Sequence, residues 1–188
     1  WLDRAPSEEA LAELKEAMRQ DVNFSRLPDV VRDRFEVVYR RLSPQDIVQR
    51  NRWLFDKTWL EHAAGEIQDQ ELDWQAREKA VESQRVETLK QILVERGTDG
   101  LLELAQYGEA QFEIGRLASL VVTDEQWLIL LQSCLRQKLN SKREVMIQGL
   151  TEEVSSDRRQ ALSQWLTALS RDAVLKLLTL MPFRRWVW

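Results

Sequence analysis

Tryptophan–leucine pairs recur along this chain at nearly constant intervals, and this spacing limits the folds that the chain can adopt. Of the eight tryptophans, Trp127 follows Trp53 by about two times 37 residues, and Trp165 follows Trp127 by about 38. Trp127 and Trp165 also share a Gln-Trp-Leu sequence. Intervals of roughly 34–47 residues are typical of two-helix units stacked in a solenoid. The spacing therefore predicts an array of helix pairs.

The composition agrees with an all-α fold. Only 6 glycines and 4 prolines interrupt 188 residues, and residue types that favour helix dominate. We predict about ten antiparallel helices in one domain spanning 1–188, arranged as an α-solenoid-like array of HEAT/TPR-like helix pairs of about 37–38 residues. The alternative is a non-repeating helical bundle. A breaker at 97–100, Gly-Thr-Asp-Gly, marks a candidate sub-boundary.

Helix starts and apolar faces can be placed from local patterns. Starts are predicted at Ser7, at Ser43-Pro44, and at the capping boxes Thr123–Gln126 and Ser141–Glu144. A long polar-rich helix is expected from about Gln68 to Arg96. The expected core includes Trp53, Trp127, Trp165 and a stripe of Val31, Phe35, Val38 and Leu42.

The residues that could carry catalysis are few. His62, the only histidine, shares helical spacing with Glu66, Asp69 and Asp73, but Gly65 interrupts the run and no second ligand helix matches it. We interpret the run as a solvated acidic face. The glycines form no phosphate-binding loop. We expect no enzyme activity, no cofactor and no metal; an enzyme with a carboxylate or histidine site between helices stays as an alternative.

Clustered arginines are the feature that could bind nucleic acid. Arg40, Arg41, Arg50 and Arg52 lie in one stretch, near aromatic residues. Acidic residues interleave with them, and the sequence pI is near 5.3. We therefore interpret the arginines as solvated or paired, keep them as candidate interaction residues, and keep nucleic-acid binding as the alternative function.

The aromatic carboxyl end suggests a contact outside the chain. Trp186 and Trp188 close the sequence, although chain ends are usually solvated. We expect the chain to be part of a longer protein, with these two tryptophans meeting a neighbouring domain or causing self-association. The alternative is a terminal helix that folds back and buries them.

The single cysteine and the hydropathy pattern indicate the compartment. Cys134 excludes an internal disulfide and lies in an apolar helical pattern, which favours a buried thiol over a nucleophile. No apolar run approaches the roughly 18 residues needed to span a membrane. We expect a cytoplasmic location and no membrane partner.

Three short stretches carry a resemblance to a class of proteins. They are the run from Arg50 to Phe55, the run from Gly115 to Ala118, and the run from Leu180 to Phe183. The stretches resemble the helical-repeat regions of very large bacterial proteins that carry an ATPase-type or other effector domain elsewhere. The resemblance implies a recognition or scaffolding part. With the missing catalytic motifs, it predicts a protein-interaction or structural scaffold module of a larger bacterial protein.

Overall fold

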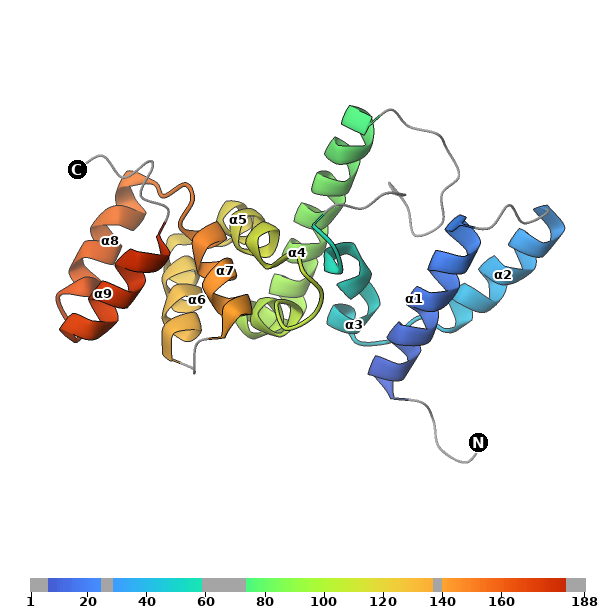
Figure 1. Ribbon diagram of the computed structural model, residues 1–188, viewed down its shortest axis with the longest axis horizontal. Coiled ribbons are helices and arrows are strands. Elements are labelled where there is room, and N and C mark those ends of the chain that lie inside the picture. The colour runs from blue at the N-terminus through green and yellow to red at the C-terminus, as the bar shows by residue number, and fades with distance from the viewer. Residues whose placement is uncertain (1–6, 25–28, 59–73, 137–139, 182–188) are drawn as a thin grey trace.

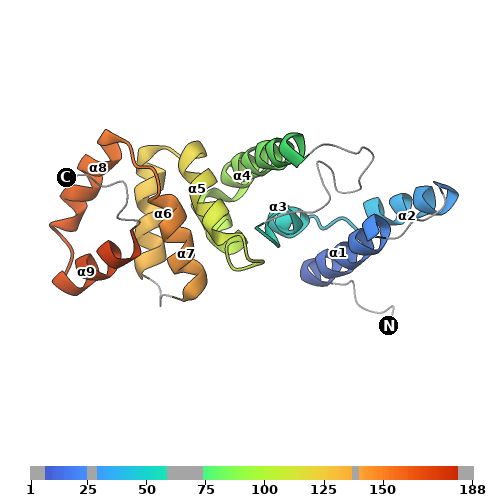
Figure 2. The same cartoon turned by 45° about the horizontal axis from the view of Figure 1, so that its top comes forward.

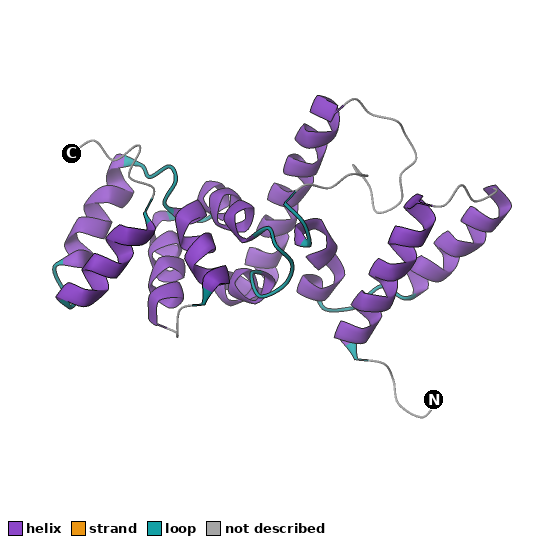
Figure 3. Ribbon diagram, in the orientation of Figure 1, coloured by secondary structure: helices purple, strands orange, loops and turns teal. Residues whose placement is uncertain are grey.

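Every element of the computed structural model is helical in the residues that the structure describes, which are 7–24, 29–58, 74–136 and 140–181 (Figure 3). The all-α prediction is confirmed. The elements are α1 (Glu8–Phe24), α2 (Asp29–Arg41), α3 (Ile47–Asn51), the 3-10 helix η1 (Arg52–Phe55), α4 (Trp74–Leu104), α5 (Gln111–Val121), α6 (Asp124–Arg136), α7 (Ser141–Leu150), α8 (Ser156–Leu166) and α9 (Arg171–Leu180).

The helices form an elongated row. The α1–α2 hairpin lies at one end, α8 and α9 lie at the other, and α3 to α7 lie between them (Figures 1 and 2). In the central and carboxyl-terminal part, α4 packs on α6, α6 on α8, α5 on α7 and α7 on α9. The α1–α2 hairpin joins this part through contacts between α1 and α3. No helix within the described ranges has the combination of length and apolar character that a bilayer crossing requires.

Most helix starts are fixed by local side-chain caps. The Ser7 hydroxyl accepts from the Ala10 N–H at 3.1 Å, and the Thr123–Gln126 capping box forms with both reciprocal bonds, at 3.0 and 3.2 Å. Two predicted starts are wrong. Asp46, rather than Ser43, caps α3, and Asn140, rather than Ser141, caps α7.

Gly97 ends the first part of α4, as the predicted breaker requires. Its φ of 63° and ψ of −159° lie outside the helical region and in a region that essentially only glycine adopts. The chain then turns into a short second segment that ends at Leu104. The start predicted near Gln68 falls on residues 59–73, which lie outside the described residues.

One core runs from α3 to the end of α9. It contains Trp53, Trp127 and 25 other buried side chains between Ile47 and Met181, on both sides of Gly97. The Trp127 ring is fully buried, and its indole N–H donates to the Leu150 carbonyl at 2.9 Å. Trp165 is only partly buried at the edge of the core, so its assignment as a core residue is wrong.

Helices α5 and α7 cross with their backbones in direct contact. A Cβ atom added at Gly115 would overlap the Met146 carbonyl oxygen, and one added at Gly149 would overlap the Phe112 carbonyl oxygen. Each helix thus presents a glycine to the backbone of the other, which permits an approach closer than any side chain would allow.

Two arginines bind carbonyl oxygens at the ends of helices. Arg85 is 5% exposed and donates to the carbonyls of Leu54 and Lys57, both at 2.8 Å. Arg158 donates to the carbonyls of Ser119 and Val122 at the end of α5, at 2.7 and 2.9 Å. The last carbonyls of a helix have no partner within the helix, so these arginines satisfy them and tie α4 to η1 and α8 to α5.

Candidate functional site

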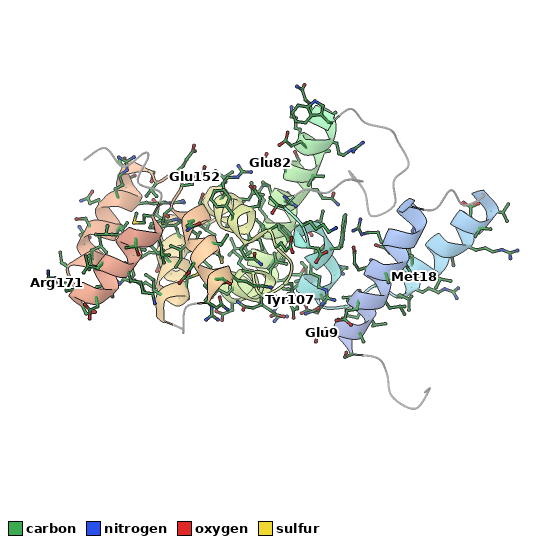
Figure 4. The ribbon with its side chains drawn as sticks, viewed as in Figure 1. Glu9, Met18, Glu82, Tyr107, Glu152 and Arg171 are labelled. Atoms are coloured by element: carbon green, nitrogen blue, oxygen red, sulfur yellow. The ribbon has the colours of Figure 1, made fainter. Side chains whose placement is uncertain are left out.

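A charged cleft lies where α1 faces α3 and η1. It has a volume of about 430 Å³, within the range of ligand-binding clefts. Glu9, Glu13 and Lys15 line it from α1, and Arg50 and Arg52 line it from α3 and η1. Figure 4 labels two of the lining residues, Glu9 on α1 and Tyr107 after α4.

A glycine holds the loop after α4 against η1 and so forms part of this cleft. Gly108 has a φ of 57°, and a Cβ atom there would lie 2.5 Å from the Asp56 Cα. The Glu109 N–H donates to the Asp56 carbonyl at 2.8 Å. This close approach brings the Tyr107 ring beside Arg52.

Cations lie over aromatic rings along the cleft. The Lys15 ammonium lies 4.5 Å from the centre of the Tyr39 ring, and the Arg19 guanidinium lies 5.0 Å from the Trp53 ring. Arg52 lies 5.1 Å from the Tyr107 ring. Such pairs are attractive because the face of an aromatic ring is electronegative. They join α1 to α2 and to η1.

All three of these cations also have polar partners. Arg19 donates to both Glu16 carboxylate oxygens, at 2.7 and 2.6 Å. Burial acts to lower the Arg19 pKa, but the Glu16 bonds and charge outweigh it, so the pKa is raised. Arg52 donates to the Gln49 side chain at 3.1 Å, and Lys15 donates to the Ser43 hydroxyl at 2.9 Å. Hydrogen bonds and ring contacts therefore hold the elements around the cleft together, and the cationic side chains named here already have partners within the chain.

Charged side chains of both signs line the cleft. Four carboxylates and three basic side chains line it, without histidine or cysteine. In the part of the chain that the structure describes, no group of three or more His, Cys, Asp or Glu side chains could hold a metal ion. A cleft of this composition suits a segment that carries both charges.

A second surface lies on α2. Val30, Val31, Val37 and Val38 are 65%, 38%, 54% and 47% exposed. Arg34 and Arg41 are exposed on the same helix. We call these six residues the apolar-basic face of α2. The prediction that α2 buries a stripe of apolar residues is thus wrong at Val31 and Val38, because the helix packs the side that carries Tyr39 against the molecule. The Phe35 side chain lies outside the described part.

The predicted interaction residues fall into two groups. Arg50 and Arg52 line the cleft, whereas Arg40 and Arg41 lie in the last turn of α2, and neither lines the cleft. The structure therefore divides the four arginines between two surfaces. Trp186 and Trp188 lie outside the described residues, as do His62, Glu66, Asp69 and Asp73.

Cys134 is a buried thiol. Its side chain is fully buried, and its Sγ lies 4.0 Å from the Sδ of Met146. Burial raises the pKa of this thiol to about 12. The prediction that Cys134 is buried is confirmed, and a nucleophilic cysteine needs its thiolate form near neutral pH.

Sequence reasoning missed the aromatic residues of the cleft. Tyr39, Tyr107, Lys15 and Arg19 were not singled out. One signal was present: Lys15 and Arg19 are four residues apart on α1 and so share a face. The rings that they cover come from other elements, which local spacing does not reveal.

Comparison with protein-family models, with curated proteins and with solved structures found no match. The function is therefore inferred from the surfaces of this chain alone.

Proposed function

We propose that this chain is a protein-interaction module of a larger bacterial protein, in the cytoplasm, without catalytic activity of its own. The observation that carries the proposal is the apolar-basic face of α2. Ten large hydrophobic side chains are exposed in the described part of the chain, and five of them lie on α1 and α2. Contiguous apolar surface of this kind marks interaction sites in folded proteins.

The packing order of the helices supports a solenoid-like array as the scaffold. Each helix from α4 to α7 contacts the helix two places further along the chain. Stacked helix pairs make this contact between equivalent helices of successive pairs. A non-repeating bundle is the alternative. Within this chain the α1–α2 hairpin lies at one end of the row, and its apolar-basic face is exposed (Figure 1).

Nucleic-acid binding is the second candidate, because Arg34, Arg40 and Arg41 are exposed on α2. Two observations rank it lower. Four exposed valines share the apolar-basic face with its two arginines, and the net charge of the chain is −4. Phosphate binding relies on a surplus of basic side chains along a surface.

An enzymatic function ranks third. Its candidate residues, from His62 to Asp73, lie outside the described residues. The other side chain that could act as a nucleophile is the thiol of Cys134, which is buried and has a raised pKa. We therefore base no reaction on either.

Site-specific photo-crosslinking tests the proposal. A photo-reactive amino acid is placed at Val37 on the apolar-basic face, and at Val94 on α4 as a control. Val94 is a matched control because it is also a valine and is 86% exposed. We expect the Val37 position to form a discrete protein adduct in extracts of the source cells, and the Val94 position to form none. The partner found by mass spectrometry is then purified and its binding measured directly.

Two results would contradict the interaction-module proposal. One is the absence of a protein adduct from either position under conditions in which the probe reacts with added test peptide. The other is an adduct at Val37 that nuclease digestion removes, which would support the nucleic-acid alternative.

A further inference from the structure

The sequence of α2 repeats after seven residues on the side that faces solvent. Val30-Val31 is followed by Arg34, and Val37-Val38 is followed by Arg41. The opposite side holds the buried Tyr39, which is 2% exposed. One side of α2 thus packs on the molecule, whereas the side with the seven-residue repeat is exposed to solvent.

A seven-residue repeat fits a helix as the occupant of this face. Two turns of an α-helix take 7.2 residues, so residues seven apart lie almost directly above each other. Val30, Arg34, Val37 and Arg41 follow at intervals of four, three and four residues. These four residues therefore form one stripe along the helix in which valine alternates with arginine, and another helix can lie along such a stripe.

The charges on the face indicate the chemistry of that helix. Arg34 and Arg41 form no salt bridge with another described residue. Asp33 is exposed on the same helix, one turn before Val37, and is the one described carboxylate of α2. Partner surfaces carry complementary charges, because like charges brought together are costly. The occupant should therefore carry carboxylates beside its apolar residues.

A second copy of this face is a poor occupant. Two copies of the apolar-basic face in contact would bring four arginines together, two from each copy, and Asp33 is the one described carboxylate that each α2 adds. The surplus of positive charge disfavours self-docking and favours an acidic partner.

We propose that the apolar-basic face of α2 docks an acidic amphipathic helix of a partner protein. The proposal rests on the proposed function as an interaction module and adds the chemical class of the partner. The 13 residues of α2 extend over roughly 20 Å at 1.5 Å per residue, and an interface this short belongs to the weak, transient class.

Binding of designed peptides to the full chain tests the proposal. The probe is a fluorescent peptide of about three heptads, with leucine at the core positions and glutamate beside them. A matched peptide carries lysine in place of every glutamate. We expect fluorescence anisotropy to show binding of the acidic peptide at least about tenfold tighter than binding of the basic peptide.

Charge reversal gives the sharper result. In the Arg34→Glu/Arg41→Glu variant we expect the preference to invert, so that the basic peptide binds more tightly. The control is Arg171→Glu/Lys176→Glu on α9, at the far end of the row, where both residues are exposed and the change in net charge is the same (Figures 1 and 4). The control should keep the preference of the unaltered chain.

Removal of the apolar contacts should weaken binding without changing the preference. We expect Val30→Ser/Val37→Ser to weaken binding of the acidic peptide about tenfold, whereas Val94→Ser/Leu175→Ser, which alters two exposed residues on other helices, should leave it unchanged. Far-ultraviolet circular dichroism of every variant checks that helix content is retained.

Several outcomes would overturn the inference: binding of neither peptide, equal binding of both, or equal loss in the α9 control. Binding of the face to phosphatidylserine vesicles but not to the acidic peptide would identify a membrane surface instead. Self-association in sedimentation, abolished by Val30→Ser/Val37→Ser, would identify a second copy. A crosslinked protein partner that binds through a basic segment would refute the acidic helix while leaving the interaction module intact.

Discussion

At the scale of single residues, Trp127 and Trp165 share a sequence pattern but differ in burial. Trp127 is fully buried and donates to the Leu150 carbonyl, whereas Trp165 is partly exposed at the core edge. We expect Trp127→Ala to lower the free energy of unfolding by about 3–5 kcal/mol, as loss of a buried large aromatic ring does. We expect Trp165→Ala to cost about 1–2 kcal/mol, because less apolar surface is lost.

Urea denaturation measures both losses. Trp127→Phe serves as the conservative control, since it keeps a ring and removes the hydrogen bond to Leu150; it should cost less than Trp127→Ala. Equal losses for the two alanine variants would show that Trp165 is as much a core residue as the shared Gln-Trp-Leu pattern first indicated.

The Cys134 thiol makes stability depend on pH in the alkaline range. Burial raises its pKa from about 9 to about 12, so the folded chain holds the thiol proton where the unfolded chain releases it. Its contribution is fully present below pH 9 and is lost as pH rises from about 9 to about 12. We expect a slope of about 1.4 kcal/mol per pH unit in this window.

The comparison is with Cys134→Ala, which has no thiol to ionise. We expect the difference in unfolding free energy between the two chains to shrink as pH rises from 9 to 11, measured by urea denaturation. Iodoacetamide should leave the folded chain unmodified at pH 8. A constant difference together with rapid alkylation of the folded chain would show that Cys134 is accessible.

The residue-scale predictions that succeeded relied on hydrophobicity, and those that failed needed tertiary contacts. The burial of Trp127 and Cys134 follows from an apolar helical pattern. The cleft depends on Gln49 donating to the Tyr107 hydroxyl and on Arg52 covering the same ring, between positions more than fifty residues apart. A single sequence gives no spacing rule for such pairs, so the cleft could not be predicted.

At the scale of helices, the starts were predictable to within a few residues, because a cap is a local hydrogen bond. The Thr123–Gln126 box formed as predicted. Asp46 and Asn140 replaced the predicted caps because each is itself a good cap close to the expected start. The exposed side of α2 was missed since its valines look like core residues until the neighbouring helices are placed.

The crossing of α5 and α7 depends on two glycines. We expect Gly115→Ala and Gly149→Ala each to cost about 3 kcal/mol or more, because each added methyl group would overlap a carbonyl oxygen of the other helix. Urea denaturation gives the values, and Ser163→Ala, on the exposed side of α8, is the control with little expected change.

The two changes should also be coupled. Once one alanine has moved the helices apart, the methyl group of the second alanine overlaps less with the facing backbone. The double variant should therefore lose less unfolding free energy than the sum of the two single variants. Additive losses, or losses under about 1 kcal/mol for both single variants, would contradict the close backbone contact at this crossing.

At the scale of the whole molecule, the all-α class follows from composition, but which basic side chains bind within the fold does not. Arg85 and Arg158 were available for an external ligand in the sequence, yet both bind carbonyl oxygens at helix ends. Lys142 likewise donates to the Gln106 carbonyl. Basic side chains that donate to carbonyl oxygens within the fold in this way do not add to a phosphate-binding surface.

This distribution predicts that the chain binds nucleic acid poorly. Its net charge is −4, and the basic side chains of the cleft lie among carboxylates. We expect dissociation constants for duplex DNA and single-stranded RNA weaker than about 10⁻⁴ M at low salt, where phosphate contacts are strongest. Fluorescence anisotropy with an acidic control protein of similar size measures them.

The informative variant is Arg40→Glu/Arg41→Glu/Arg50→Glu; Arg52 is kept because it covers the Tyr107 ring and supports the fold. Micromolar binding that falls steeply with salt and disappears in this variant would replace the interaction module with a nucleic-acid-binding domain.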